Sequence, residues 1–350
     1  MATPLRVALV GYGLAGRFFH APFIAATPDF AVASVITSDP ERRAAAEREI
    51  PGVQLLGSVD ELWRRAGEHD VAVVATPNRL HATVARAALE AGLHVVVEKP
   101  FAARAGEARA LVEEARSRDR VLTVYHNRRW DGDFLTIAQI LATGSIGQVT
   151  RFESRFERWQ PDPNLSAWRQ GSEPDAAGGL IYDLGSHLVD QAIQLFGRPL
   201  SIYAETASRR PGVTVDDDSF IALEHAGGVR SHLSMSAVAA LPAPRFRVLG
   251  STGAYAKDGL DVQEEQLRAG LRPGDAGFGV EPAERWGRLF SNGQERSHPT
   301  QSGRWVVFYP QLADAIRNGA APPVDPNHAV VVIEVLEAAL QSARTGSVWR

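Results

Sequence analysis

Residues 5–16, LRVALVGYGLAG, join an apolar run directly to a glycine pattern and decide the fold of the first third of the chain. Gly11, Gly13 and Gly16 follow the spacing G-x-G-x-x-G, and a helical pattern, RFFHAPFIAA, comes next. In this order the first glycine permits a tight turn, the second lets the backbone approach a pyrophosphate, and the third lets the helix pack on its strand. We therefore expect a phosphate-binding loop that also includes Leu14 and Ala15; a glycine-rich turn without a ligand is the alternative.

Short apolar runs alternate with helical patterns as far as Tyr125, which predicts parallel strands joined by crossover helices. The expected strands are residues 5–10, 31–36, 71–75, 94–97 and 121–125. Beyond them, longer alternating stretches with turn signals predict a mostly antiparallel sheet, from residues 149–159, 219–225, 229–237 and 245–249. The prediction is an α/β chain with a doubly wound domain over residues 1–125 and a second α/β domain over residues 126–350. Residues 269–282, rich in glycine and proline, are predicted to form a loop.

Composition excludes several classes of partner. The 350 residues carry a formal charge of -4, and their arginines are scattered among carboxylates, so no basic patch for nucleic acid is expected. No apolar run reaches the roughly 20 residues of a membrane-spanning helix. The absence of cysteine excludes disulfides and thiolate metal sites and is compatible with the cytoplasm, and no other spacing indicates a metal. We expect a cytoplasmic protein with a small-molecule partner.

The end of the second predicted strand, VITSDPERR, bears on the choice of cofactor. NAD-binding proteins usually place an acidic residue there to bind the ribose hydroxyls. Here Thr37 and Ser38 stand at that point, Asp39 comes late beside a proline, and Arg42 and Arg43 follow. Hydroxyls with arginines nearby favour a 2′-phosphate, so NADP is predicted over NAD. The alternative is that Asp39 caps a helix and both arginines are solvated.

The stretch HVVVEKPFA, residues 94–102, ends an apolar strand on Glu98 and Lys99. Ligands of a doubly wound sheet lie beyond the carboxyl ends of its strands, and Pro100 restricts Lys99 to extended geometry. An ammonium aimed in this way can stabilise the oxyanion that develops when a carbinol is oxidised. A salt bridge that closes the strand is the competing interpretation.

A second cluster lies in AGGLIYDLGSHLVDQAIQLFG, residues 177–197. If a helix begins near Gly179, Asp183 and His187 lie four residues apart on one face, an arrangement suited to acid/base chemistry. Asp190 is either a partner of His187 or a surface charge. A histidine on an amphipathic helix is by itself more often structural.

These motifs together resemble the Gfo/Idh/MocA family of NAD(P)-dependent sugar and cyclitol oxidoreductases. The resemblance rests on GYGLAG, ATPNRLH (residues 75–81), EKPFA and the glycine-to-aspartate run at 178–190, and it covers nearly the whole chain. Finer stretches resemble the branch that contains NADP-dependent scyllo-inositol dehydrogenases. The resemblance implies a Rossmann domain, a second domain whose open sheet makes the subunit contact of a homodimer or homotetramer, and Lys99, Asp183 and His187 in the catalytic positions. It also implies that the Lys99–Pro100 bond is cis.

Other residues are weaker candidates. The predicted cofactor contacts, besides the glycine loop and the end of the second strand, are Thr76, Pro77, Asn78, His81, Glu98, Lys99 and Asn127. The predicted substrate contacts, besides the catalytic residues, are Tyr125, Arg129, Trp168 and Arg169.

The expected activity is an NADP(H)-dependent dehydrogenase acting on a secondary alcohol of a cyclitol, polyol or aldose. Two rivals remain: a glycosidase of the same fold that uses its cofactor transiently, and a non-catalytic dinucleotide sensor.

Overall fold

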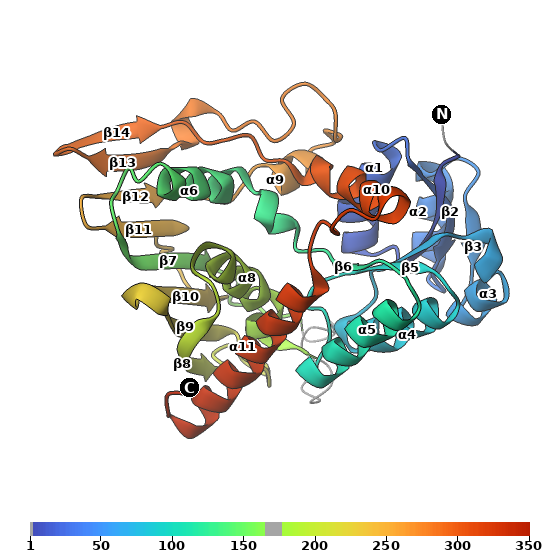
Figure 1. Ribbon diagram of the computed structural model, residues 1–350, viewed down its shortest axis with the longest axis horizontal. Coiled ribbons are helices and arrows are strands. Elements are labelled where there is room, and N and C mark those ends of the chain that lie inside the picture. Colours follow the sequence, from blue (N-terminus) through green and yellow to red (C-terminus); the bar gives the residue numbers. More distant parts are fainter. Residues whose placement is uncertain (1–2, 165–176) are drawn as a thin grey trace. The chain divides into compact units, whose positions relative to one another are not determined.

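The computed structural model describes residues 3–164 and 177–350, which form two units (Figure 1). The first unit comprises Met1–His126, Glu265–Phe278 and Trp305–Val330, and the second Asn127–Glu264, Gly279–Arg304 and Val331–Arg350. The sequence prediction assigned everything after residue 125 to one continuous domain. By contacts, two later segments belong with the first unit instead.

The first unit is built on a six-stranded sheet in the order β3-β2-β1-β4-β5-β6, with every pair parallel. Its strands are β1 (Leu5–Val10), β2 (Phe30–Ile36), β3 (Gln54–Leu56), β4 (Val71–Val74), β5 (His94–Val97) and β6 (Leu122–Val124). The strand order reverses between β1 and β4, and in such sheets this is the point where ligands bind.

Helices cover both faces of this sheet (Figure 1). A π-helical turn, η1 (Ala15–His20), leads into α1 (Ala21–Ala25); α2 (Pro40–Glu49) follows β2, and α10 (Phe308–Asn318) packs beside α1. The other helices are α3 (Val59–Arg64), α4 (His81–Glu90) and α5 (Ala105–Ser117). Because helices lie on both faces, the central strands are largely apolar, and all four residues of β4 are buried.

The second unit contains an eight-stranded sheet in the order β14-β13-β12-β11-β7-β10-β9-β8. Its pairs are antiparallel except for β7 with β10. The strands are β7 (Val149–Glu157), β8 (Pro199–Ala207), β9 (Asp218–His225), β10 (Arg230–Ser236), β11 (Phe246–Gly250), β12 (Gly253–Lys257), β13 (Gly287–Ser291) and β14 (Gln294–His298). The helices are α6 (Gly132–Ala142), α7 (Gly179–Asp183) and α8 (Gly185–Phe196), while α9 (Gln263–Arg268) and α11 (Pro326–Thr345) run from one unit into the other.

The predicted fold class is confirmed: a parallel Rossmann sheet and a large, mostly antiparallel sheet. Five strands were missed. β3 has only three residues, too few to show a period, and β14, QERSH, has no strongly apolar residue because it is exposed along most of its length. β8, β12 and β13 were also not predicted. Residues 269–282 contain no helix or strand, as expected. In the described part of the chain, no helix has the length and apolarity needed to cross a membrane.

Two glycines of the predicted loop are required by close contacts of the backbone. Gly11 has φ +100°, and a Cβ there would lie 2.4 Å from the carbonyl oxygen of Ala75. A Cβ on Gly16 would lie 2.1 Å from the carbonyl oxygen of Gly11. Both distances are far shorter than van der Waals contact, so neither position has room for a side chain. The loop therefore holds β1, β4 and the following helix together at the switch point.

Candidate active site

The glycine loop and the end of β4 fit a dinucleotide. Gly13 has no strongly positive φ, but a Cβ there would point toward the guanidinium of Arg42, 3.6 Å from its Nη1 atom. Thr76 follows β4, and its buried hydroxyl oxygen has no hydrogen-bond partner among the described residues. An unpartnered buried hydroxyl beside a bare backbone loop is what a bound polar ligand would satisfy.

At the end of β2, Asp39 accepts hydrogen bonds from the N–H groups of Glu41 and Arg42 and so caps α2. The carboxylate also pairs with Arg42 at 3.3 Å, although the Arg42 side chain stays 53% exposed. The Arg43 guanidinium donates to the carbonyl oxygens of Thr37 and Leu55. The helix-cap interpretation of Asp39 is therefore correct, while the two arginines differ: Arg43 braces the strand ends, and Arg42 lies beside the loop.

His81 joins two loops of the first unit. One ring nitrogen lies 2.7 Å from the carbonyl oxygen of Pro100 and the other 3.0 Å from that of Thr76. Burial lowers the pKa of His81, so the ring is neutral at neutral pH and has one N–H. We assign that N–H to the shorter contact, with Pro100. His81 thus holds the loop after β5 through its hydrogen bond to Pro100, and its direct contact with a cofactor stays a prediction.

Lys99 lies at the carboxyl end of β5, and the bond to Pro100 is cis as the resemblance implied. Its backbone N–H donates to Oε2 of Glu98 at 3.0 Å. The other carboxylate oxygen of Glu98 lies 3.0 Å from Nε2 of His20. Burial opposes ionisation of Glu98, but the hydrogen bond and charge of His20 and the charge of Lys99 outweigh it and lower the pKa of Glu98 below its usual value. A buried, ionised carboxylate therefore accepts a hydrogen bond from the backbone of Lys99.

Tyr125, a predicted substrate contact, is almost fully buried, and its hydroxyl donates to the carbonyl oxygen of Phe19 at 2.7 Å. Its role in substrate binding stays a prediction. Trp168 and Arg169 lie outside the described residues.

In the second unit, the predicted helix through Asp183 and His187 is interrupted. α7 ends at Asp183 and α8 begins at Gly185, although Leu184 still donates to Leu180 and accepts from Leu188. The single-helix prediction was wrong in detail. Gly185, the first residue of α8, packs closely on β10: a Cβ there would lie 3.0 Å from the sulfur of Met235. His187 is buried, with its ring 6.3 Å from that of Phe156.

Asp216 holds the beginning of α7. Its carbonyl oxygen accepts from the N–H of Leu180, and its carboxylate accepts from the N–H of Ile181 and the hydroxyl of Ser219, each at 2.8 Å. Gly179, at φ +81°, has no room for a Cβ, which would lie 1.9 Å from the carboxylate. The segment before β9 therefore fixes the residues that lead to Asp183.

The face of α8 next to His187 is held by charged side chains. Asp190 forms a two-bond ion pair with Arg129, at 2.8 and 2.5 Å, and both side chains are at least nine-tenths buried. Asp190 is thus no surface charge. Whether Arg129 also binds substrate stays a prediction, as does a cofactor contact for the buried Asn127.

Gln191, fully buried, connects α8 to a cluster of buried charges. Its Nε2 donates to the carbonyl oxygen of Arg128, and its Oε1 accepts from Arg245 at 3.0 Å. The Arg245 guanidinium also stacks on Phe156 and Phe246, with its central carbon 4.1 and 4.0 Å from the ring centres. Burial lowers the pKa of Arg245 to about 10, so it stays charged at neutral pH.

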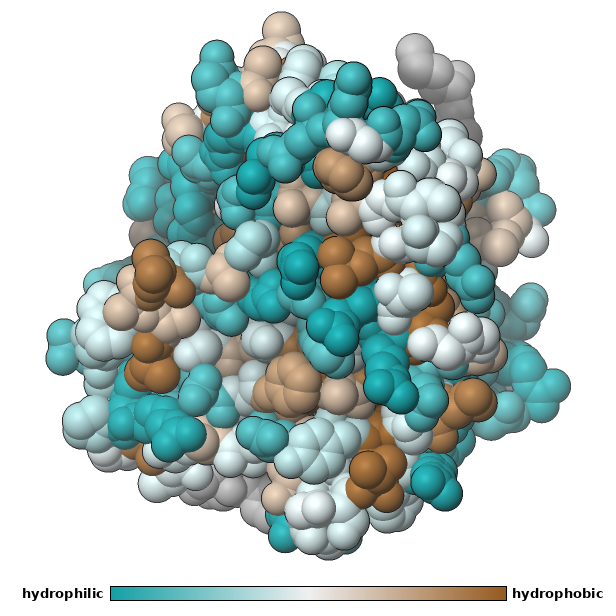
Figure 2. Space-filling model, turned by 90° about the vertical axis from the view of Figure 1, so that its left-hand side faces the viewer, coloured by the Kyte–Doolittle hydropathy of each residue, from teal (hydrophilic) through white to brown (hydrophobic). Residues whose placement is uncertain are grey.

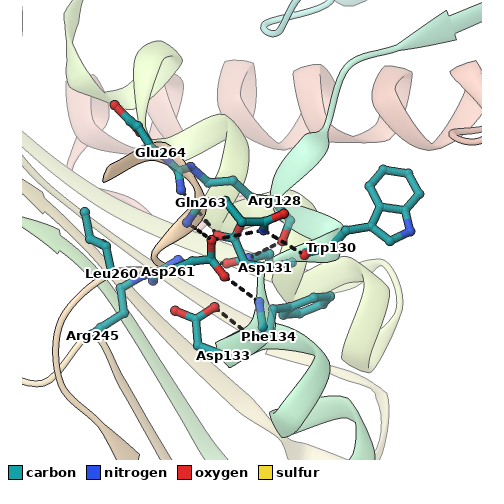
Figure 3. Close-up of polar contacts among 12 residues, drawn as sticks. Arg128, Trp130, Asp131, Asp133, Phe134, Arg245, Leu260, Asp261, Gln263 and Glu264 are labelled. Carbon is teal, nitrogen blue, oxygen red and sulfur yellow. Dashed lines mark hydrogen bonds and ion pairs between the residues drawn. The ribbon is translucent and has the colours of Figure 1, made fainter. Parts of the chain in front are cut away.

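Carboxylates balance these arginines (Figure 3). Arg128 pairs with Asp131 at 3.3 Å and with Glu264 at 3.0 Å. Burial, and then the charge of Asp133, raise the pKa of Asp261 to about 6. Because this value lies above that of an unfolded aspartate, protonation favours the folded state, and this stabilisation is lost as the pH rises from about 4 through about 6.

Sequence reasoning missed the supporting residues His20, Tyr309, Asp216 and Gln191. Asp216 had a local signal, since the acidic run VDDDSF directly precedes a strand. His20 and Tyr309 had none, because they are far apart along the chain.

A glycine loop at the switch point of a parallel sheet, with a lysine at the end of β5, defines a dinucleotide-binding oxidoreductase. Two family descriptions match the chain: "Oxidoreductase family, NAD-binding Rossmann fold" over residues 5–126, and "GFO/IDH/MocA C-terminal domain" over residues 134–256. The chain belongs to the Gfo/Idh/MocA family. Its members are NAD(P)-dependent dehydrogenases that act on CH–OH groups of sugars and cyclitols.

Similar proteins match over nearly their whole length. The chain is 40% identical to the uncharacterized oxidoreductase YdgJ of Escherichia coli (strain K12), over 98% of each chain. It is 32% identical to the scyllo-inositol 2-dehydrogenase (NADP(+)) IolW of Bacillus subtilis (strain 168), over 97% of this chain and 94% of that protein. The solved structure of yvaA from Bacillus subtilis superposes with a TM-score of 0.92 at 31% identity, over 99% of each chain.

The anchoring of α7 predicts the effect of a substitution at Asp216. Replacement of Asp216 with alanine leaves the N–H of Ile181 and the hydroxyl of Ser219 without their acceptor. We expect a loss of about 1–3 kcal/mol in the free energy of unfolding, measured by urea denaturation. Asp218→Ala is the matched control, because the Asp218 carboxylate makes one exposed pair among the described residues, with Arg209, worth at most about 1 kcal/mol. Equal losses in the two variants would contradict the anchoring role.

Proposed function

We propose that the protein is an NADP(H)-dependent dehydrogenase that interconverts a secondary alcohol and a ketone on a cyclitol such as an inositol, or on a polyol or aldose. The observation that carries this proposal is Lys99, held by a buried ionised carboxylate at the end of a strand of the dinucleotide-binding sheet. The likeness to a protein named scyllo-inositol 2-dehydrogenase (NADP(+)) supports the cyclitol class. The cysteine-free composition supports a cytoplasmic location.

In this proposal three residues, Lys99, Asp183 and His187, act directly on the substrate. The Lys99 ammonium donates to the substrate hydroxyl oxygen and stabilises the negative charge that develops there. His187 accepts the hydroxyl proton, and Asp183 orients the substrate. Bound NADP would supply the two-electron acceptor for the carbinol hydrogen.

Residues of the first unit would hold the cofactor. The backbone of the loop, Gly11, Gly13, Leu14, Ala15 and Gly16, would bind the pyrophosphate. Thr37, Ser38 and Arg42 would bind the adenosine ribose and its 2′-phosphate, with Arg43 bracing them. Thr76, Pro77 and Asn78 would line the path from the loop toward Glu98 and Lys99.

We also propose that the protein is a homodimer or homotetramer that associates through the second unit's sheet. On β7, Phe152 and Phe156 are buried on the face that carries α8, so Arg151, Glu153 and Arg155 lie on the opposite face. Glu153 is buried there, paired with Arg155 at 2.6 Å and with Arg247 at 3.2 Å. Figure 2, which views the molecule from the left-hand side of Figure 1, shows apolar residues scattered among hydrophilic ones. Sedimentation equilibrium should give a dimer or tetramer mass; a monomer at micromolar concentration would exclude the proposal.

The activity is tested with a panel of inositols, polyols and keto-sugars, each offered with NADP and NAD and followed at the nicotinamide absorbance. We expect turnover of a cyclitol or sugar. Lys99→Met should keep cofactor affinity and lose about a hundred- to a thousandfold in kcat, because the oxyanion loses its donor. His187→Ala should lose about a hundred- to ten-thousandfold, and His187→Gln should not restore the rate.

Three outcomes would contradict the proposal. Near-normal rates in Lys99→Met would favour the competing interpretation, in which Lys99 forms a salt bridge that closes the strand. Turnover of a glycoside without net change in nicotinamide absorbance would indicate the glycosidase. Tight cofactor binding with no consumption across the panel would indicate the sensor.

Arg42 provides the test of cofactor preference. Replacement of Arg42 with alanine should reduce kcat/KM with NADP by about tenfold or more, because a charge-assisted hydrogen bond is lost, and should leave NAD nearly unaffected. Arg48→Ala, on the same helix, is the control and should change neither value. Equal or better efficiency of the wild type with NADH and NAD than with the phosphorylated forms would refute the preference.

A further inference from the structure

A buried chain of hydrogen bonds in the first unit ends at the peptide of Lys99. The hydroxyl of Tyr309, on α10, lies 2.7 Å from Nδ1 of His20. Nε2 of His20 lies 3.0 Å from Oε1 of Glu98, and Oε2 of Glu98 accepts from the Lys99 N–H at 3.0 Å. Tyr309 and His20 are 289 positions apart, so the fold alone brings this chain together.

The positions of the protons follow from the partners. An ionised carboxylate only accepts, so Nε2 of His20 must carry a proton and donate it to Glu98. Burial, with smaller effects of Tyr125 and Glu98, holds the pKa of Tyr309 well above its usual value, so its hydroxyl keeps its proton. Nε2 of His20 therefore donates to Glu98, while Nδ1 faces the Tyr309 hydroxyl, which can donate to this nitrogen or accept from it. Both ring nitrogens thus have a hydrogen-bond partner.

Packing fixes the ring in this orientation. His20 is fully buried, and the ring of Tyr125 lies 4.3 Å from it, centre to centre. The Tyr125 hydroxyl is itself held by the carbonyl oxygen of Phe19, the residue before His20. The ring of Tyr309 packs edge-on against Phe30 and Phe308. Rotation of the imidazole would break two hydrogen bonds between buried groups, which is costly.

We propose that His20, oriented by Tyr309, is a positioning residue that holds the Glu98 carboxylate in place beneath Lys99 and thereby fixes the peptide from which the lysine side chain projects. This inference rests on the catalytic role proposed for Lys99. Without the donor at Nε2, the Glu98 carboxylate would keep a single hydrogen-bond donor among the described residues, the N–H of Lys99, and it would either take up a proton or turn away. In both cases Lys99 loses its fixed support.

A second histidine of the same unit offers a matched comparison. His69 is also buried, with hydrogen bonds to the hydroxyl of Ser34 at 2.8 Å and to the carbonyl oxygen of Arg65 at 3.1 Å. Neither partner contacts Glu98 or Lys99. The loss of His69 therefore costs packing and hydrogen bonds of a similar kind without touching the lysine.

The experiment compares His20→Leu, His20→Gln and His69→Leu in steady-state kinetics, with NADP affinity measured by fluorescence and folding by circular dichroism. His20→Leu should lower kcat on the order of ten- to a hundredfold through misplacement of Lys99, with less than about a threefold change in the NADP dissociation constant. His20→Gln should recover most of the rate, because its amide N–H reaches the position of Nε2. His69→Leu should lower the melting temperature and leave kcat unchanged.

Equal rates in His20→Leu and His69→Leu would overturn the inference, as would equal losses in His20→Leu and His20→Gln. If His20→Leu does not fold, Tyr309→Phe takes its place, since it removes one hydroxyl and keeps the ring. A kcat about two- to tenfold lower supports the inference, and an unchanged kcat overturns it.

A double variant separates this inference from the proposed function. When Lys99→Met is nearly inactive, adding His20→Leu should lower the residual rate no further, because His20 acts through Lys99. An additional loss equal to that in the wild-type background would show that His20 acts elsewhere. If Lys99→Met is active, the role of Lys99 fails, whatever His20 does.

Discussion

The close approach of Gly11 to the carbonyl of Ala75 is the contact on which the first unit depends. It brings the end of β1 against the end of β4 at the point where the strand order reverses, and Gly16 repeats the arrangement one turn later against Gly11 itself. Gly13, between these two positions, carries no side chain, so the backbone of the loop can be approached by a pyrophosphate. The same contact sets the direction of the helix that follows, and that helix carries His20 into the interior. The cofactor loop and the support of Lys99 are thus parts of one segment.

Each unit contains a buried charge near a residue of the proposed site, and each such charge has a partner that is distant in the sequence. A residue proposed to act on substrate stands next to a buried charge, and that charge is matched by a partner distant in the sequence: Glu98 by His20, Asp190 by Arg129. Buried charges cost several kcal/mol when unpaired, so such pairs add little net stability but penalise any other arrangement strongly. A strong penalty for every other arrangement is useful in an active site, because its residues must stay in one arrangement. The pairs fix the orientation of α8 and of the Lys99 peptide without requiring the reactive side chains themselves to be immobile.

The sequence predicted the features that have a local signature. The strand, glycine and helix order of residues 5–16, the strand before Lys99 and the alternating pattern of β7, β9 and β10 all appear where expected. Strands without a period were missed, because β3 is too short and β14 is exposed. The break at Leu184 was missed because the sequence around it, YDLGSH, contains no proline that would mark a helix end. At the candidate site the reactive residue types were recognisable in motifs, whereas their hydrogen-bond partners are set by tertiary contacts that leave no local pattern.

A motif identifies the reactive residues but not the partners that hold them in place. The stretch EKPFA specifies a carboxylate, a lysine and a rigid turn, but it does not specify what keeps the carboxylate ionised in a buried position. Here that task falls to His20, whose Nε2 lies 3.0 Å from Oε1 of Glu98, and to Tyr309, whose hydroxyl lies 2.7 Å from Nδ1 of the same ring. A chain that keeps the motif and lacks an N–H donor at this position must satisfy the carboxylate by another group or accept a protonated one. In the second case the negative charge next to Lys99 disappears, and the Lys99 N–H loses its ionised acceptor.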